Sequence, residues 1–385
     1  MWIGACTSTI GTWMQTLAQS WLVLQISGSP FYLGLDSFLG QIPIFLLSMV
    51  GGVLADRMDR RHLLLFSQVI QMTCAFTLAG LVASGVVHVW HILSLSFCVG
   101  VAQSIGGPAY QSLIPQLVKS EDLPNAIAMN SIQFNLARVI GPVLGGIALS
   151  KLGASWCFSL NGVSYVAVII TLLMIRSQFQ KQDNPQRMLD SMKQGIAFIR
   201  ERAAMGSLIV IAFLMTMLGL PLIVFLPVFA RDIFHQGADG FTAFLVASGL
   251  GSIVGALLVA TFHHGRQKGR MAVVNLLLLG LVIVGFATSR TLWLSYGLLF
   301  IGSSLLISAF ALISSLVQII ATDKMRGRVM SIYNVAFRGG MPFGGLISGK
   351  LAETYGVPTV VAANGALLAC LGLYILVMRK RVSEL

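Results

Sequence analysis

A short charged segment, Gly52-Val53-Leu54-Ala55-Asp56-Arg57-Met58-Asp59-Arg60-Arg61, separates two long apolar stretches near the start of the chain. The stretches cover residues 31–55 and 62–84, and each is long enough to cross the ~30 Å hydrocarbon core of a bilayer as a helix. Charged side chains gather at the end of the segment, whereas only 10% of the whole chain is charged. The segment therefore predicts a loop at the membrane surface between two transmembrane helices.

The same pattern continues along all 385 residues, of which 56% are hydrophobic, and this composition excludes a soluble globular protein. Apolar runs bounded by charge clusters or Pro/Gly turns predict an all-α integral membrane protein with twelve transmembrane helices. The predicted spans are 1–27, 31–55, 62–84, 89–113, 125–150, 155–175, 206–229, 240–262, 271–288, 291–318, 328–351 and 356–378. Twelve spans take about 240 residues, which leaves no room for a large extramembrane catalytic domain, and no enzyme is expected.

The basic residues indicate how the chain is oriented in the membrane. Lys and Arg number 25 against 13 Asp and Glu, a net charge of +12 that would suggest a nucleic-acid partner in a soluble protein. Here 19 of the 25 lie in alternate loops or the C-terminal tail, as the positive-inside rule requires of cytoplasmic segments. We therefore expect both termini in the cytoplasm, a bacterial inner-membrane location, and no nucleic-acid partner. The other six are Arg138, Lys151, Arg231, Arg290, Arg338 and Lys350.

An internal repeat indicates a duplicated fold. An offset of 200 residues aligns Arg138 with Arg338, Pro142 with Pro342, and Gly145 with Gly345, and an offset of 203 aligns Asn161 with Asn364. Two parallel six-helix halves, related by a pseudo-twofold axis, are typical of transporters that rock two bundles about a central site. The predicted domains are an N-terminal six-helix bundle (1–175), a cytoplasmic linker (176–205) and a C-terminal six-helix bundle (206–385).

The linker contains a predicted amphipathic helix, because five apolar side chains fall on one helical face. They are Met188, Leu189, Met192, Ile196 and Ile199. Two interpretations stay open: a basic helix that lies on the inner leaflet and ties the halves together, or an ordinary solvated linker helix.

The segment from Gly52 to Arg61 resembles the signature loop of the major facilitator superfamily, Gly-x-x-x-Asp-Arg-x-Gly-Arg-Arg, with Asp59 where the motif has Gly. The resemblance covers essentially the whole chain and implies the major facilitator fold. It also implies that Gly52, Asp56, Arg57, Arg60 and Arg61 control a cytoplasmic gate. Simple anchoring of the loop by its positive charges is the alternative interpretation.

The predicted fifth helix carries a Gly-Pro-x-x-Gly-Gly core formed by Gly141, Pro142, Gly145 and Gly146. It resembles the antiporter motif of drug and metabolite exporters, in which small residues and a proline let the fifth and eighth helices approach and bend. Together with residues 13–30, the chain is most similar to the branch of enterobactin exporters and macrolide efflux proteins, the transmembrane secretion effectors.

This resemblance implies a secondary active transporter that exports an amphipathic or hydrophobic small molecule, such as a drug, siderophore or metabolite, by alternating access. Proton antiport is the expected drive, and neither a cofactor nor a metal is expected. The alternatives are uptake or lysolipid flipping by the same fold, or a non-transporting scaffold or receptor. The expected partners are the small-molecule substrate and the lipid bilayer, and the expected state is a monomer.

Three ionisable residues lie inside predicted spans, where each costs several kcal/mol to bury, so they are candidates for the substrate cavity or for coupling. Arg138 and Arg338 lie near the middle of the bilayer, and Asp36 lies ~8 Å from its outer surface at 1.5 Å per residue. We predict that Asp36 pairs with Arg338 as an outer gate; the alternative is that Asp36 reaches the outer surface and Arg338 packs within its own half. Further candidates for the cavity wall, or for hydrogen bonds between packed helices, are Gln15, Gln19, Gln103, Ser304 and Ser308.

Overall fold

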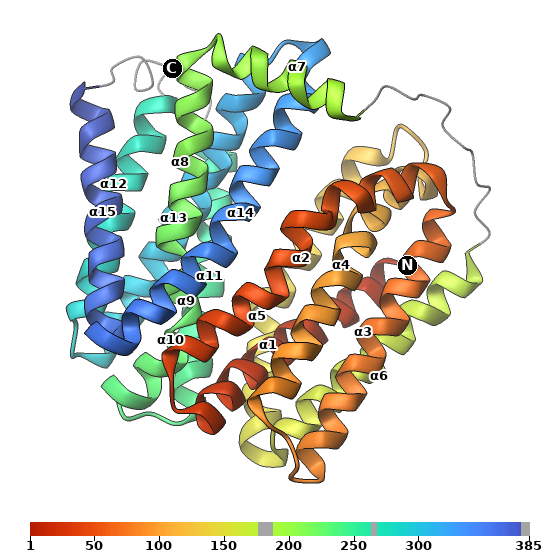
Figure 1. Cartoon of the computed structure of the whole chain (residues 1–385), viewed down its shortest axis with the longest axis vertical. Helices are drawn as coiled ribbons and strands as arrows, with labels where there is room; N and C mark the ends of the chain where they lie inside the picture. Colours follow the sequence, from red (N-terminus) through yellow and green to blue (C-terminus); the bar gives the residue numbers. More distant parts are fainter. Residues whose placement is uncertain (176–187, 263–267, 379–385) are drawn as a thin grey trace. The chain divides into compact units, whose positions relative to one another are not determined.

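The computed structural model describes residues 1–175, 188–262 and 268–378, and every regular element in these ranges is a helix (Figure 1). The chain divides into two compact units. The first unit comprises Met1–Asp183 and His235–Val246, and the second comprises Asn184–Phe234 and Ala247–Leu385. The all-α membrane architecture predicted from the apolar runs is confirmed, whereas the predicted domain boundaries stay a prediction.

The first unit contains six long helices and the beginning of a seventh. They are α1 (Trp2–Ser27), α2 (Pro30–Arg57), α3 (Arg60–Ala83), α4 (Val89–Leu117), α5 (Leu123–Leu152), α6 (Ala154–Met174) and the first part of α11 (Ala238–Phe262). Helix α1 packs against α5 and α6, α3 packs against α4 and α6, and α2 packs against α4. A buried apolar cluster that includes Leu64, Leu113 and Leu172 joins α3, α4 and α6.

The second unit begins with α7 (Met188–Arg200) and α8 (Ala203–Gly219). Pro221 and Pro227 interrupt the next stretch, because proline cannot donate the helical hydrogen bond. The remaining elements are α9 (Pro221–Val224), α10 (Leu226–Val228), the π-helix η1 (Phe229–Ile233), the rest of α11, α12 (Lys268–Thr288), α13 (Leu292–Ile320), α14 (Asp323–Tyr355) and α15 (Val357–Met378). Helix α12 packs against α13 and α15, and α8 packs against α14.

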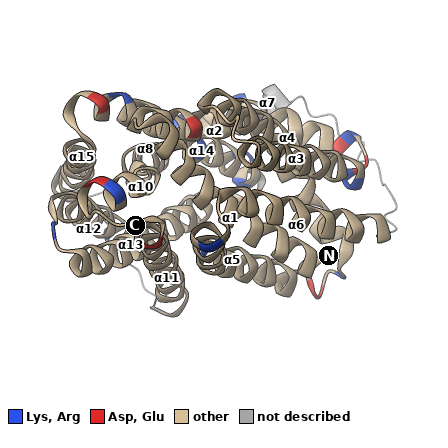
Figure 2. Cartoon of the chain, turned by 90° about the horizontal axis from the view of Figure 1, so that it is seen from below, with Lys and Arg blue, Asp and Glu red and all other residues tan. Residues whose placement is uncertain are grey.

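Ten helical stretches in the described ranges are long and apolar enough to cross a membrane. Two further helices, α1 and α14, have 26 and 33 residues but carry more polar side chains. Figure 2 shows how sparse charged residues are, since most of the ribbon is neither blue nor red. The predicted count of twelve spans stays a prediction.

Contacts within each unit define how the two halves correspond. A Cβ atom added at Gly141 of α5 would collide with Trp13 of α1, and one added at Gly340 of α14 would collide with Thr216 of α8. One helical turn later, Gly145 packs in the same way on Met14, and Gly344 packs on Met217. The packing therefore relates α5 to α14 at an offset of 199 residues, not the 200 of the sequence alignment.

This register corrects one inference from the sequence repeat. At an offset of 199, Arg138 corresponds to Phe337, and Arg338 corresponds to Val139. One residue rotates a side chain by about 100° around a helix, so the two arginines face different directions within their units. They are separate features and not one feature repeated.

Candidate functional site

A carboxylate lies inside the first unit and is held by neutral donors. Helix α2 begins at Ser29, whose side chain accepts a hydrogen bond from the Phe31 amide at 3.2 Å, with Pro30 at the first helical position. This start places Asp36 almost two turns inside the helix. The Gln19 Nε2 atom of α1 donates to the Asp36 oxygens at 3.1 and 2.9 Å, and the Ser96 hydroxyl of α4 donates to Asp36 Oδ1.

Asp36 has no cationic partner in the part of the chain that the structure describes. The predicted pair with Arg338 joins the two units and stays a prediction. Within the first unit, the charge of the Asp36 carboxylate is balanced only by the dipoles of Gln19 and Ser96. Protonation of this carboxylate removes the cost of holding an uncompensated charge in a span.

The hydrogen bonds continue from Asp36 across the unit. Gln15 Nε2 donates to Gln19 Oε1 at 3.3 Å, and Asn161 Nδ2 of α6 donates to Gln15 Oε1 at 2.6 Å. The chain of contacts therefore runs from α2 through α1 to α6. Gln15 and Gln19, both predicted as candidates, are members of one connected network with Asp36.

Gln103 belongs to a second network in the same unit. Its amide donates to Gln71 Oε1 of α3 at 3.1 Å, and the Tyr165 hydroxyl of α6 donates to the same oxygen at 3.2 Å. Gln71 in turn donates to the Ser67 hydroxyl at 3.1 Å. The interior of this unit is therefore polar as well as closely packed.

Five members of these networks were missed in the sequence: Ser67, Gln71, Ser96, Asn161 and Tyr165. Each is a polar residue inside a predicted span, which was the available signal. Ser and Asn also serve as ordinary contacts between membrane helices, so only the crossing of the helices distinguishes these five.

Arg138 has a partner within the first unit that was not predicted from the sequence. Its guanidinium carbon lies 5.5 Å from the centre of the Trp13 ring, and Trp13 also contacts Phe134 edge-to-face at 6.2 Å. An arginine over a tryptophan face is a cation–π contact, which strengthens when water is excluded. Arg338 is exposed on α14 and has no ion pair within the described ranges.

The signature segment fastens three helix ends in the first unit. Arg60 donates to the carbonyl oxygens of Ala55 and Ser112, each at 3.1 Å. Arg61 donates to the carbonyl oxygens of Leu172 at 2.6 Å and Leu173 at 2.9 Å. Ala55, Leu172 and Leu173 lie in the last turns of α2 and α6, where helix carbonyls carry partial negative charge, and Ser112 lies five residues before the end of α4.

The remaining motif residues behave differently from one another. Asp56 is 4.0 Å from Arg60 and its side chain is 60% exposed, so this ion pair contributes little. Asp59, where the family motif has Gly, caps α3 by accepting from the Arg61 amide at 2.9 Å. Arg57 is exposed and has no ion pair among the residues described.

At the start of the signature segment, the close helix contact is made by Gly51 and not by Gly52. A Cβ atom at Gly52 would meet nothing within 4 Å, whereas one at Gly51 would collide with the Ser104 carbonyl of α4. Neighbouring helical positions point about 100° apart, and Gly51 is the one that faces α4.

The glycines of the antiporter-like motif also contact different helices. Gly141 and Gly145 pack on α1, and Gly146 packs against Thr242 of α11. Pro142 lies inside α5.

In the second unit, the two candidate serines face a neighbouring helix. Ser308 donates to the Gly255 carbonyl of α11 at 3.0 Å, and a Cβ atom at Gly255 would collide with the Ser304 carbonyl. Both serines are buried where α13 packs on α11, so they serve helix packing. Helix α7 also packs in this unit, where Arg328 donates to its Gln194.

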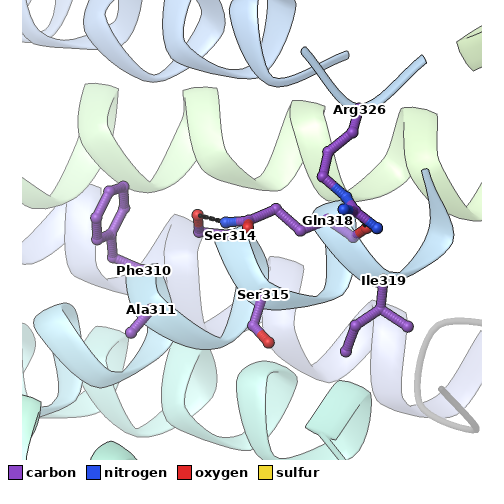
Figure 3. Close-up of a pocket in the computed structure, with 7 residues that line it drawn as sticks. All are labelled: Phe310, Ala311, Ser314, Ser315, Gln318, Ile319 and Arg326. Atoms are coloured by element: carbon purple, nitrogen blue, oxygen red, sulfur yellow. Dashed lines mark hydrogen bonds between the residues drawn. The ribbon is translucent and has the colours of Figure 1, made fainter. Parts of the chain in front are cut away.

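A pocket of about 530 Å³ lies beside these helices, at the C-terminal end of α13 and the start of α14 (Figure 3). It was not predicted from the sequence. The lining residues are Phe310, Ala311, Ser314, Ser315, Gln318, Ile319 and Arg326. No group of three His, Cys, Asp or Glu side chains in the described ranges is placed to hold a metal ion.

The entire chain, residues 1–385, matches the family described as "Transmembrane secretion effector". Similar proteins include a staphyloferrin A transporter of Staphylococcus aureus, 22% identical over 94% of this chain and 91% of its own length. A macrolide efflux protein A of Streptococcus pyogenes is 20% identical over 97% and 93%. An enterobactin exporter, EntS, of Citrobacter koseri is 25% identical over 92% and 85%.

Solved structures show the same fold. A bacterial homologue of the lysosomal transporter Spinster, inward-facing and occupied, has a TM-score of 0.76 at 14% identity and covers 98% of this chain and 96% of that one. The nucleoside transporter NupG has a TM-score of 0.74 at 16% identity over 98% of each chain. The chain is thus an integral membrane transporter, not an enzyme, and belongs to the transmembrane secretion effector family of the major facilitator superfamily.

Proposed function

We propose that this protein exports an amphipathic or hydrophobic small molecule from a bacterial cytoplasm across the inner membrane, by alternating access and in exchange for protons. Relatives named as a macrolide efflux protein and an enterobactin exporter support the export direction, and one named as a staphyloferrin A transporter supports a small-molecule substrate. The protein works as a monomer with both termini in the cytoplasm.

The observation that carries the proton coupling is the environment of Asp36. It is a carboxylate within a span, held by Gln19 and Ser96 and without a cation among the described residues. The charged carboxylate of Asp36 is stabilised by the hydrogen bonds from Gln19 and Ser96. When Asp36 is protonated, it is neutral and these bonds stabilise it less. Binding and release of a proton at Asp36 therefore changes the hydrogen bonds that join α2 to α1 and to α4. A change in these contacts between helices can shift the equilibrium between two conformations of the bundle.

The test uses the full chain in proteoliposomes with an acidic lumen and a pH indicator inside. We offer a panel of fluorescent amphipathic dyes, including dansylate and ethidium. Antiport predicts that at least one dye accumulates as protons leave the lumen. Asp36→Asn should abolish accumulation against a gradient while dye-for-dye exchange without a pH gradient continues. Asp239→Asn, the same chemical change at an exposed helix end, should behave as wild type.

Three outcomes would contradict the proposal. Accumulation that requires an alkaline lumen would indicate proton-coupled uptake. Absence of movement for every dye, in folded protein, would favour a scaffold or receptor. Undiminished accumulation by Asp36→Asn would show that the proton is carried elsewhere.

A further inference from the structure

The pocket of the second unit has a polar end and an aromatic end. At the polar end, Gln318 donates to the Ser314 hydroxyl at 3.4 Å, and Ser315 lines the same wall (Figure 3). Among the described residues that line it, Arg326 is the one that carries a charge. Since guanidinium offers five donors and no acceptor, this end suits a ligand group that is anionic or rich in acceptors.

Arg326 is available to such a ligand despite its present partner. Its Nη2 atom lies 2.8 Å from Asp323 Oδ1, but the Asp323 side chain is 90% exposed. An ion pair this open to water contributes at most about 1 kcal/mol, so a ligand carboxylate or sulfonate competes with it readily. Arg326 also donates weakly to the Gln318 carbonyl at 3.4 Å, which holds the guanidinium over the pocket.

At the aromatic end, Phe310 lines the pocket and belongs to a cluster of three rings. Its ring centre is 4.3 Å from that of Phe337 and 6.3 Å from that of Tyr333. These neighbours limit how Phe310 can turn. A flat ring of a ligand can therefore pack against Phe310 without the cost of ordering a mobile side chain.

An unsatisfied hydroxyl links the two ends. Tyr333 is fully buried, and its hydroxyl has no hydrogen-bond partner within the described chain, although it lies near Ser314. Such a group costs about 1–3 kcal/mol. Ser314 now accepts from Gln318. A ligand acceptor that takes the Gln318 amide would remove this restraint on the Ser314 side chain, which could then turn its oxygen toward the Tyr333 hydroxyl.

We propose that this pocket is a binding site for the anionic, aromatic end of the exported molecule, with its ring on Phe310 and its acid group on Arg326 and Gln318. The volume of about 530 Å³ fits a small molecule and not a peptide chain. The proposal rests on the proposed transport function and adds the chemical class of the substrate, which no sequence motif indicated.

The test compares two probes that share one naphthalene ring system: dansylate, a sulfonate anion, and dansyl cadaverine, an ammonium cation. Binding to the full chain in lipid nanodiscs is followed by fluorescence anisotropy, and empty nanodiscs give the background. We expect dansylate to bind at least about tenfold more tightly than dansyl cadaverine. Arg326→Gln should remove this preference, and Phe310→Ala should weaken both probes by about tenfold.

Two further variants make the result specific. Tyr333→Phe keeps the ring cluster and removes only the hydroxyl, so it should weaken dansylate by about threefold and leave melting unchanged or raised. Arg270→Gln removes a cytoplasmic-side arginine of α12 that does not line the pocket and should bind both probes as wild type does. If Arg326→Gln fails to fold, the ratio of the two probes on wild-type protein still decides.

Equal affinity of wild type for the two probes overturns the proposal, as does dansylate binding that is unchanged in both Arg326→Gln and Phe310→Ala. The assay uses no pH gradient, so its outcome is independent of coupling. Charge-selective binding without dye accumulation would support the binding pocket and refute the proposed export function. Accumulation that depends on Asp36 but not on Arg326 or Phe310 would support the export function and refute the binding pocket.

Discussion

The two units share a fold but differ in their interiors. In the first unit, amides and a carboxylate form continuous networks through Gln15, Gln19 and Asp36. Gly51 on the Ser104 carbonyl and Gly255 on the Ser304 carbonyl are similar close contacts between helices. The second unit keeps hydroxyl pairs, such as Ser248 with Ser303 at 2.8 Å, and adds an aromatic pocket.

This difference separates two tasks that one transporter must perform. Under the two proposals, the Asp36 network in one unit responds to a proton and the pocket in the other unit responds to a substrate, independently of each other. Transport is then coupled if proton binding and substrate binding each shift the same conformational equilibrium of the transporter. Thermodynamic linkage requires nothing more. A duplicated fold permits this because each copy keeps the scaffold while its interior diverges.

The largest effect is expected at the glycines that define the repeat. Gly340→Ala forces a methyl group into Thr216 and the Phe213 carbonyl, so it should destabilise by about 1–3 kcal/mol. Gly327→Ala, in the same helix with open space around it, should stabilise by up to about 1 kcal/mol through helix propensity. Thermal unfolding in nanodiscs measures both. Equal shifts for the two would show that the 199-residue register is wrong.

The equivalent asparagines offer the next test. Asn161 donates at 2.6 Å to Gln15 in the network that contains Asp36, whereas Asn364, its repeat partner, donates to the Ser348 hydroxyl at 2.9 Å. Asn161→Leu leaves the Gln15 oxygen without its donor and should reduce dye accumulation by about tenfold, near 1.4 kcal/mol. Asn364→Leu should change it less than about twofold, because a serine hydroxyl can rotate to another acceptor.

Initial rates of dye accumulation in proteoliposomes compare the two variants, with melting temperature as the control for folding. Similar losses in both would mean that the two interiors are not specialised. A loss confined to Asn364→Leu would reverse the assignment of coupling to the first unit.

Much of the fold could be predicted from sequence because it depends on composition and charge position. Predicted spans such as 62–84 and 155–175 lie within a residue or two of α3 and α6. Asp36 was also predictable, since a carboxylate in a span stands out. Ser96 was not, because its role depends on where α4 crosses α2. The alignment of Arg138 with Arg338 failed for the same reason: identity of residues does not report which face packs.

The two arginines give a prediction of intermediate size. Arg138→Gln should lower stability by about 1–2 kcal/mol through loss of the contact with Trp13. Arg338→Gln, on an exposed position, should lower it by less than about 0.5 kcal/mol. A double-mutant cycle of Arg138→Gln with Trp13→Leu, read by thermal unfolding, isolates the pair. Additive effects would mean that Arg138 acts through some other contact.

The smallest effect is expected at Asp59, in the signature segment between α2 and α3. Asp59 caps α3 through the Arg61 amide, and it also contacts His62 at 2.9 Å. Asp59→Ala should cost about 1 kcal/mol, whereas Asp59→Gly, which restores the family motif, should cost only a few tenths, because glycine is itself a favourable cap. Thermal unfolding resolves the difference if both variants are measured with Arg60 and Arg61 intact. The corresponding loop of the second half, residues 263–267, lies outside the described ranges. If Asp59→Gly proved as costly as Asp59→Ala, the aspartate would stabilise the loop through its charge near His62. This chain would then differ from its family in the electrostatics of the loop, and not only in the residue at the turn.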